Sequence, residues 1–423
     1  MSYASLGERT ALFKAAGQIG VEDRNDLRYA HRLIMEVIRN QNRLECLLQE
    51  YMKFPEELPH GISSFLKILA FLKWVDCAEE KRLKRTVFAA RQILGWRELH
   101  DYESTIARIV FASKPSYNQL DENKRIALTT CNQEWLVKKL EVSFGRNFAL
   151  RVLQRNMRAL PTYVRINHLK NTSPSSDLVG QLQGSSKMDF YDVWKLGSPS
   201  QLNKLSHNIS KGEIVVQDLA SVVASLTASP RPGDTVLDIC AAPGNKTTHL
   251  ADLMNNEGII YSLDISPNRL DLWKRQVEQK NAEIASPILA DAENLPINCE
   301  ADIVIVDPPC SNTGVLARDP SLKWKLSDSK IRSFAKRQRA ILREASNNVR
   351  PNGVLLYCTC SLLPEENERV IEGFLEKNPN FQLETQAPFI GEPGLRGLDK
   401  CQRFYAHMHD CNGYFIARLR RIN

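Results

Sequence analysis

The sequence has no long uninterrupted apolar segment. The opening MSYASLGERT carries no apolar run of the kind that begins a signal peptide. A membrane-crossing helix needs about 18 or more apolar residues with few charges, and the chain contains no such stretch. We therefore expect neither export nor membrane insertion, and we expect the protein to work in the cytoplasm.

The ten cysteines lack the spacings of a zinc site. No Cys-x-x-Cys pair occurs, and the closest pair, Cys358 and Cys360, is separated by one residue. Disulfide frameworks belong mostly to small secreted proteins, whereas this chain has 423 residues, of which 25% are charged. We expect reduced thiols, most of them buried as small apolar side chains, and no bound metal.

The charge balance shows only a mild excess of one sign. The chain has 56 Lys and Arg against 49 Asp and Glu, which gives a net charge of +7. This excess fits an anionic partner but is too small to identify one. The length exceeds what a single core usually supports, so we expect two or three domains, in a protein that is a monomer.

The N-terminal part of the chain is expected to be helical. From Asn25 to Phe111 apolar residues recur at helical spacing, as in RYAHRLIMEVIRNQNRLECLLQEYM, with Pro and Gly between the runs. This predicts a bundle of helices, and we expect an all-helical domain over residues 1–128. One helix carries four basic residues that either contact RNA phosphates or form an ordinary solvated face: Lys81, Arg82, Lys84 and Arg85.

The pattern changes twice after this region. Residues 129–212 mix helical segments with a strand-like TYVRINHLK, and we interpret them as a small α/β module. Over residues 213–423 apolar strands alternate with helical stretches, and strands such as DIVIVD are apolar throughout. Such strands are typical of a parallel sheet covered on both faces. The sequence therefore predicts an α/β protein whose largest domain is doubly wound and Rossmann-like.

A tight turn follows the first strand of the predicted Rossmann-like domain. The strand VLDIC continues into AAPGNKTTHL, which lets a ligand approach the backbone closely at the start of a helix. Neither GxxxxGK[ST] nor GxGxxG is present, which disfavours a phosphate or pyrophosphate site. The next two strands deliver Asp264 and Asp291 to the same sheet edge. The turn and these acids together suit S-adenosylmethionine.

Two cysteines and an aspartate fall at the same predicted edge. The strand ADIVIVDPPC places Asp307 and Cys310 there, and VLLYCTCS places Cys360 at the end of the following strand. Carbon 5 of cytosine is a weak nucleophile, so a thiolate must first add to carbon 6. A carboxyl group at Asp307 can polarise the base. A helix N-terminus or a cation such as Lys246 can activate the thiol, and the residues alone leave that choice open.

Five motifs carry a resemblance to a known family. LDICAAPGNKT, SLDIS, LADA, IVDPPCSNTGVLARDPSLKW and YCTCSLLPEENE resemble the RsmB/NOL1/NOP2/Sun family of RNA 5-methylcytosine methyltransferases. The resemblance extends from about Asn132 to the C-terminus, and the N-terminal helices more weakly resemble a NusB-like RNA-binding domain. It implies methyl transfer from S-adenosylmethionine to carbon 5 of a cytosine in RNA. Ribosomal RNA is the favoured substrate, with transfer RNA as the other candidate.

The resemblance also implies a role for each matching residue. Cys360 of the Thr-Cys motif is the nucleophile, and Cys310 helps to release the product. Asp307 lies between cofactor and base, and Lys246 completes the catalytic set. The implied cofactor residues are Cys240, Ala241, Ala242, Pro243, Gly244, Asn245, Lys246, Asp264, Asp291 and Asp307.

Two positions depart from the family pattern without touching the chemistry. Asn245 stands where many relatives carry Gly, and Cys358 stands where a small residue is common. A cluster near the C-terminus, His407, His409 and Asp410, suggests a base or a metal site, but the resemblance places it in a closing strand segment. We interpret that cluster as structural.

Basic residues outside the helical region are candidates for an RNA-binding groove. The target base must leave its stack to reach a thiolate and a methyl donor, which is easiest in loops or single strands. About half of the candidate cations are expected to be simply solvated. The candidates are Arg165, Lys170, Arg318, Lys323, Lys336, Arg337 and Arg339, with Trp324 either stacking on a base or packing.

Two other functions fit part of the pattern. A non-catalytic RNA-binding ribosome assembly factor would keep the fold without turnover, but Cys310, Cys360 and Asp307 are all intact. A DNA cytosine methyltransferase would place the nucleophile at Cys310 and leave the Thr-Cys motif without a purpose. Separate mutation of the two cysteines discriminates between these functions.

Overall fold

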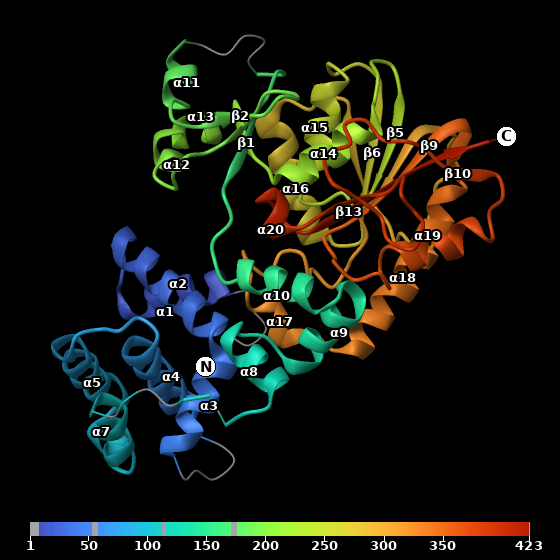
Figure 1. Cartoon of the computed structure of the whole chain (residues 1–423). Coiled ribbons are helices and arrows are strands. Elements are labelled where there is room, and N and C mark those ends of the chain that lie inside the picture. Colours follow the sequence, from blue (N-terminus) through green and yellow to red (C-terminus); the bar gives the residue numbers. More distant parts are fainter. Residues whose placement is uncertain are drawn as a thin grey trace. The chain divides into compact units, whose positions relative to one another are not determined.

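The chain forms two compact units, each described here by itself (Figure 1). The computed structural model describes residues 8–52, 58–111, 113, 116–117, 119–170 and 176–422. The first unit comprises Met1–Met157 and Asp319–Trp324, and the second comprises Arg158–Arg318 and Lys325–Asn423. The three domains predicted from the sequence, with boundaries at residues 128 and 212, stay predictions.

Helices make up the first unit, as the apolar spacing predicted. Its core is formed by residues three and four apart on successive helices, including Leu44, Leu47, Leu66 and Leu69, which are fully buried. Asp23 caps the N-terminus of α2, where its carboxylate accepts from the N–H of Asn25 at 2.7 Å. The helices are α1 (Glu8–Ile19), α2 (Arg24–Arg39), α3 (Gln41–Tyr51), α4 (His60–Trp74), α5 (Glu80–Leu94), α6 (Trp96–His100), α7 (Glu103–Phe111), α8 (Glu122–Thr129), α9 (Glu134–Phe144) and α10 (Arg146–Arg155).

A short segment from late in the chain, Asp319–Trp324, completes the first unit. Lys323 is buried, and its ammonium group donates to the carbonyl of Arg39 at 2.9 Å and to that of Cys131. Trp324 Nε1 donates to the carbonyl of Ile38 at 2.7 Å. These carbonyls lie at or just beyond the ends of α2 and α8, where Lys323 and Trp324 supply them with donors. Burial lowers the pKa of Lys323 to about 8.

A small antiparallel sheet begins the second unit. Its strands are β1 (Tyr163–Ile166), β2 (Ser186–Lys187), β3 (Val193–Lys195) and β4 (Ile214–Val216), in the order β2-β3-β1-β4. The short helices α11 (Ser176–Gln181), α12 (Gln201–Lys204) and α13 (Ser206–Lys211) accompany them. Strands and short helices thus mix here, while the small α/β module over residues 129–212 stays a prediction, because residues 129–157 belong to the first unit.

A large mixed sheet forms the centre of the second unit, in the order β11-β12-β13-β9-β8-β5-β6-β7, with β10 paired to β13. From β7 to β9 the pairing is parallel, and β13 pairs antiparallel with β9. Because the chain runs outward from β5 to β7 and then returns to β8, the winding reverses between β5 and β8. Ligands of such sheets bind outside the carboxyl ends of the strands at this reversal.

Helices cover both faces of the large sheet (Figure 1). Alternate residues of each strand enter different cores: Val236 and Ile303 join one core with α14 to α16, while Leu237 and Val304 join the other with α18 and α19. The central strands are therefore apolar throughout, as predicted. The helices of this unit are α14 (Leu219–Ala228), α15 (Asn245–Leu253), α16 (Pro267–Lys280), α18 (Asp328–Ser346), α19 (Glu368–Leu375) and α20 (Ala406–His409), while α17 (Leu322–Lys325) lies mostly in the segment that completes the first unit.

The strands of the large sheet set the positions of the candidate site residues. They are β5 (Thr235–Ile239), β6 (Ile259–Asp264), β7 (Ala285–Leu289), β8 (Ala301–Val306), β9 (Val349–Thr359), β10 (Phe381–Leu383), β11 (Glu392–Pro393), β12 (Gln402–Phe404) and β13 (Tyr414–Arg421). In the described part of the chain, no helix is both long enough and apolar enough to cross a membrane.

Candidate active site

The turn after β5 lies at the reversal point of the sheet. Cys240 has a φ of +64° and Gly244 a φ of +103°, so the chain turns sharply before α15 begins at Asn245. A Cβ at Gly244 would lie 3.0 Å from the ring of Trp273, which leaves no room for a side chain. Only glycine combines this backbone conformation with so close an approach.

Asp264 ends β6 beside this turn, as predicted. Its buried carboxylate accepts from the N–H of Ala242 at 3.3 Å and from the N–H of Ser266 at 3.0 Å. Arg269 from α16 pairs with the same carboxylate at 3.2 Å and donates to the carbonyl of Ala242. The structure thus brings together the predicted turn and its predicted acid.

Beneath the turn, Asp238 of β5 is fully buried. Its Oδ2 accepts from Thr247 Oγ1 at 2.6 Å, and Trp273 Nε1 donates to the same hydroxyl at 3.0 Å. Its Oδ1 has no hydrogen-bond partner among the described residues. Burial raises the pKa of Asp238 to about 7. Thr247 and Trp273 were not among the predicted site residues, because their apolar surroundings resemble ordinary core positions.

Asp291 follows β7 at the same edge of the sheet. Its carboxylate accepts from the N–H of Glu293 at 3.0 Å, which shapes its own loop. The side chain is half-buried. It occupies the predicted strand end, while the contacts with the turn belong to Asp264.

A buried ion pair joins β8 to α15. Lys246 Nζ lies 2.5 Å from Asp307 Oδ2, and the ammonium group also lies over the ring of Tyr414, 5.6 Å from its centre. Burial acts to lower the pKa of Lys246, but the negative charge of Asp307 outweighs it and holds that pKa above its ordinary value. The lysine therefore stays protonated and fixes the carboxylate at the edge of the sheet.

The two predicted catalytic cysteines lie against each other. Cys310 Sγ is 3.1 Å from Cys360 Sγ, and Cys360 Sγ donates to Asn312 Oδ1 at 2.8 Å. The hydrogen bond with Cys360, together with burial, raises the pKa of the Cys310 thiol well above its usual range. Cys358 is fully buried, and burial likewise raises its pKa, so Cys360 is the more accessible thiol of its motif.

The two cysteine loops are also joined through their backbones. Gly314 donates its N–H to the carbonyl of Cys360 at 2.9 Å, and Gly413 donates to the carbonyl of Gly314 at 2.9 Å. A Cβ at Gly314 would lie 2.0 Å from the carbonyl oxygen of Gly413. Glycine is required at this crossing, which the sequence marked only as part of a loop.

The histidines near the C-terminus hold local structure. His409 Nδ1 accepts from the N–H of Tyr405 at 3.0 Å at the start of α20, and Asp410 pairs with Lys195 at 2.7 Å. Within the parts of the chain that the structure describes, no three His, Cys, Asp or Glu side chains cluster in a way that could hold a metal ion.

Two of the predicted RNA-facing cations are buried, which corrects that expectation. Arg165 pairs with Asp252 at 2.9 Å and donates to Gln217 Oε1 at 2.9 Å, tying the small sheet to α15. Lys323 is enclosed in the first unit, where Trp324 also packs through its hydrogen bond. Both cations satisfy polar groups of their own unit and are withdrawn from solvent.

The other candidate cations remain at the surface to differing degrees. Arg318 pairs with Asp218 at 3.2 Å, and Arg337 pairs with Glu293 at 2.6 Å. Lys170, Lys336 and Arg339 are exposed, and none of them forms an ion pair with another residue that the structure describes. These cations stay candidates for contact with RNA.

Comparison with known proteins identifies the same part of the chain. Residues 225–420 match the family described as 16S rRNA methyltransferase RsmB/F. The chain is 26% identical over 406 residues to the probable ribosomal RNA small subunit methyltransferase B of Bacillus subtilis, covering 92% of this chain and 89% of the relative. It is 37% identical over 230 residues to a tRNA (cytosine(72)-C(5))-methyltransferase of Pyrococcus horikoshii, covering 54% of this chain and 57% of that relative.

Solved structures show the same fold. The crystal structure of PH0851 matches with a TM-score of 0.82 and 28% identity, covering 96% of this chain and 93% of the other. The structure of NSun6 from Pyrococcus horikoshii with SFG matches with a TM-score of 0.61 and 25% identity, covering 68% of this chain and 98% of the other. With the doubly wound sheet, the turn after β5 and the matched residues in agreement, residues 225–420 form a methyltransferase domain of the RsmB/F type.

Proposed function

We propose that this protein transfers a methyl group from S-adenosylmethionine to carbon 5 of a cytosine in RNA through a covalent bond between Cys360 and the base. The observation that carries the proposal is the meeting of two thiols, 3.1 Å apart, at the sheet edge that also holds Lys246 and Asp307. A single buried cysteine is commonly just a core residue. Two thiols in contact beside a buried ion pair are typical of a reaction centre.

The residues around the turn fit S-adenosylmethionine. Asp264 is an acid at the end of β6, where such a carboxylate can accept from ribose hydroxyls. Asp238 offers an oxygen without a partner among the described residues, directly below the turn. The structure of NSun6 contains SFG, an analogue of S-adenosylmethionine, which supports the same ligand here. When bound, S-adenosylmethionine supplies the electrophilic methyl group.

Cys360 would make the base reactive. Its thiolate adds to carbon 6 of the cytosine, and the electrons of the double bond between carbons 5 and 6 move toward carbon 5 and the ring nitrogen. Asp307, held by Lys246, polarises the ring at its amino group or at nitrogen 3 during this step. Carbon 5 would then take the methyl group, while the bond between that methyl and the donor sulfur would break with its electron pair left on the sulfur, giving S-adenosylhomocysteine.

Release of the product breaks the bond between Cys360 and carbon 6 of the base. A base removes the proton from carbon 5, the double bond re-forms, and the bond between carbon 6 and sulfur breaks with its electron pair returning to Cys360. Cys310 assists this step, because its thiol lies within hydrogen-bond reach of the departing sulfur. Asn312 accepts from Cys360 in the resting site and orients the thiol between the two loops.

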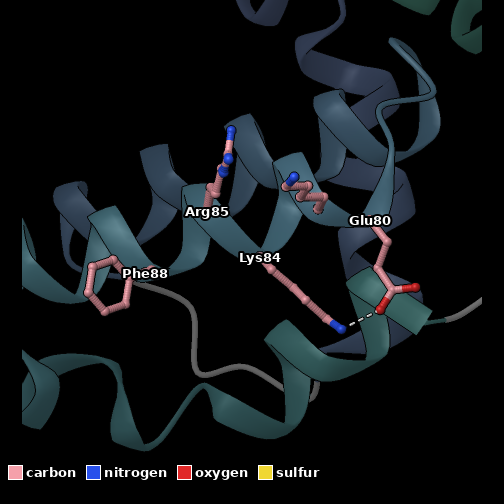
Figure 2. Close-up of a pocket in the computed structure, with 5 residues that line it drawn as sticks. Glu80, Lys84, Arg85 and Phe88 are labelled. Atoms are coloured by element: carbon pink, nitrogen blue, oxygen red, sulfur yellow. Dashed lines mark ion pairs between the residues drawn. The ribbon is translucent and has the colours of Figure 1, made fainter.

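The helix α5 offers a surface for RNA phosphates (Figure 2). An open pocket of about 520 Å³ on this helix is lined by Glu80, Lys81, Lys84, Arg85 and Phe88. Within it, Glu80 pairs with Lys84 at 2.5 Å. Phe88 is 62% exposed, so a flat apolar ring lies among cations. Cations with an exposed aromatic ring are typical of surfaces that bind single-stranded RNA. The fourth predicted cation, Arg82, pairs instead with Asp76.

Ribosomal RNA is the favoured substrate. The Bacillus subtilis relative, whose name gives ribosomal RNA, is covered over 89% of its length, whereas the transfer RNA methyltransferase is covered over 57%. The agreement with the first relative extends over 92% of this chain, and that with the second over 54%. Transfer RNA stays the second candidate.

Mapping of new 5-methylcytosine tests this function. The protein is incubated with labelled S-adenosylmethionine and total RNA from a strain that lacks it, and modified sites are then mapped by sequencing. We expect one new site that the Cys360→Ala variant fails to produce. Cofactor binding without any new site would overturn the proposal and favour an RNA-binding ribosome assembly factor.

The two cysteines are distinguished by trapping. Cys310→Ala should accumulate a covalent complex between protein and RNA, visible as a band of lower mobility, because release is slowed while addition continues. Cys360→Ala should form no such band. The opposite result would place the nucleophile at Cys310, as in a DNA cytosine methyltransferase.

A further inference from the structure

Two loops from neighbouring strands must keep the catalytic thiols in contact. Cys310 and Ser311 follow β8, and Cys360 and Ser361 follow β9. The backbone bond from Gly314 to Cys360 joins the loops on one side, and behind the cysteines the hydroxyl oxygens of Ser311 and Ser361 lie 3.2 Å apart. If the two sulfur atoms are to stay 3.1 Å apart, the part of the loops behind the cysteines must be fixed as well.

Glu366, which lies between β9 and α19, supplies that second connection. Its fully buried carboxylate accepts from both loops: Ser311 donates its N–H at 2.8 Å and also its hydroxyl, and Ser361 donates its hydroxyl at 2.5 Å. Gln338 of α18 donates to it at 3.0 Å and to the carbonyl of Pro309 at 3.0 Å. Each carboxylate oxygen therefore accepts from two uncharged donors.

The surrounding groups leave this carboxylate little freedom to move. Thr313 Oγ1 lies 3.3 Å from Ser311 Oγ and 3.2 Å from Ser361 Oγ, and it accepts from the N–H of Leu362 at 2.9 Å. The backbone carbonyl of Glu366 itself accepts from the hydroxyl of Tyr357 on β9 at 2.6 Å. Both carboxylate oxygens of Glu366 are thus fully used as acceptors, which holds the side chain in one geometry.

We propose that Glu366 is a positioning residue that sets the spacing of Cys310 and Cys360 for product release, through the serine that follows each cysteine. The proposal rests on the function proposed above. The charge of Glu366 has a second effect, on the pKa of the Cys310 thiol. The hydrogen bond with Cys360 and burial raise that pKa most, and Glu366 adds to the rise. Cys310 then keeps the proton that it offers to the departing sulfur.

The sulfur spacing can be measured without RNA. Diamide oxidises two neighbouring thiols to a disulfide and is itself reduced to the hydrazine, so the rate of cross-link formation reports how often the sulfurs meet. Tandem mass spectrometry of the cross-linked peptides separates Cys310–Cys360 from bonds to Cys299 or Cys358. We expect rapid cross-linking in the unchanged protein and at least about tenfold slower cross-linking in Glu366→Ala.

The effect on turnover should appear in kcat and in the trapped complex. A misplacement of about 1 Å can cost about 100-fold in rate. Glu366→Ala should therefore lower kcat by about 10- to 100-fold, leave KM for RNA nearly unchanged, and accumulate the covalent complex as Cys310→Ala does. Glu366→Gln should restore most of the spacing, because its carbonyl oxygen keeps two donors and the serine hydroxyls can turn to accept from its amide.

Matched variants separate positioning from a general loss of stability. Glu384→Gln removes a carboxylate that accepts from Arg418 and Arg420, away from both cysteine loops, and should change neither cross-linking nor kcat. If Glu366→Ala does not fold, Ser361→Ala and Ser311→Ala each remove a single hydroxyl donor and should slow cross-linking by smaller factors.

The two proposals fail in distinguishable ways. An unchanged protein that methylates no RNA overturns the proposed function, while the cross-linking rates still test Glu366. Cross-linking and kcat at unchanged rates in a folded Glu366→Ala protein overturn the positioning role, even where methylation is observed. A loss of kcat without slower cross-linking overturns it as well.

Discussion

Lys246 Nζ and Asp307 Oδ2 lie 2.5 Å apart, so the first turn of α15 is fixed to the end of β8 by a single ion pair. The pair spans the winding reversal of the sheet, between the cofactor turn on one side and the Pro-Pro-Cys loop on the other. Methyl donor and base must be aligned across this point. In the proposed function, the pair therefore links cofactor binding to the alignment of the base.

Lys246→Met should lower both stability and activity. The change removes a buried ammonium group, which is only 10% exposed, and leaves the half-buried Asp307 without its cation, at a cost of about 1–3 kcal/mol in the free energy of unfolding. Methyl transfer should fall by about 100-fold or more, because the base is no longer polarised. Thermal unfolding and transfer of labelled methyl groups measure the two effects.

Lys195→Met is the matched control for this change. It breaks a pair of similar length with Asp410, 2.7 Å, but both side chains are more than a third exposed. Its stability should change by less than about 1 kcal/mol, with activity retained. Equal losses in the two variants would contradict a special role for the Lys246–Asp307 pair.

Gly244→Ala should weaken cofactor binding beyond what backbone strain explains. Gly233 has a similar φ of +91° with open space around its missing Cβ, whereas a Cβ at Gly244 meets Trp273 at 3.0 Å. Gly233→Ala should cost about 1–3 kcal/mol from strain alone. Gly244→Ala should cost more and lower the affinity for S-adenosylmethionine, as isothermal titration calorimetry can measure. Equal effects of the two substitutions on affinity would argue against the collision.

The stability of the ligand-free protein should depend on the ionisation of Asp238. Its pKa rises from an ordinary 3.8 to about 7 on folding, because burial disfavours the charged form. Between about pH 4 and pH 7 the folded state therefore holds a proton that the unfolded state has lost, and the free energy of unfolding falls as the pH rises. The cost is absent below this window and complete above it.

Asp238→Asn should lack this dependence. Its amide keeps an oxygen for Thr247, so the stability of the variant relative to the unchanged protein should increase from pH 4 to pH 7 and then level off. Urea unfolding at several pH values measures the difference. A difference that stays constant across the window would show that Asp238 is charged in the folded state.

Arg85→Glu should weaken RNA binding through α5. Replacing a phosphate-contacting cation lowers affinity for all sequences and reduces the slope of log K against log salt by about one. Arg108→Glu, an exposed position on α7, makes the same change in net charge and serves as the control. Filter binding with ribosomal RNA fragments at several salt concentrations compares the two. Equal losses would indicate an effect of net charge rather than of this surface.

Prediction from the sequence succeeded where local pattern and sheet geometry decide the outcome. Apolar runs ending in Asp264, Asp307 and Cys360 predicted strand ends, and the shared edge of a parallel sheet then brought these residues together. It failed for Arg165 and Lys323, since whether a cation is buried depends on partners far away in the chain.

Glu366 could not have been singled out in advance. It stands in PEENE among acids of the same kind, and its role arises from serines in two loops that meet only in the folded sheet. From the sequence, Cys310 and Cys360 could be placed only at the same edge of the sheet. Their contact could not be predicted, because the spacing of the two sulfur atoms depends on that network.

Most of the first unit is synthesised before the second, but the segment that completes it comes late in the chain. A ribosome releases the chain from its N-terminus, so the first 157 residues emerge well before Asp319–Trp324. Until then the carbonyls of Arg39 and Cys131 lack the ammonium group of Lys323. The hydrogen bonds that Lys323 and Trp324 add to this unit can form only when most of the second unit has also been synthesised, so the completion of the two units is linked in time.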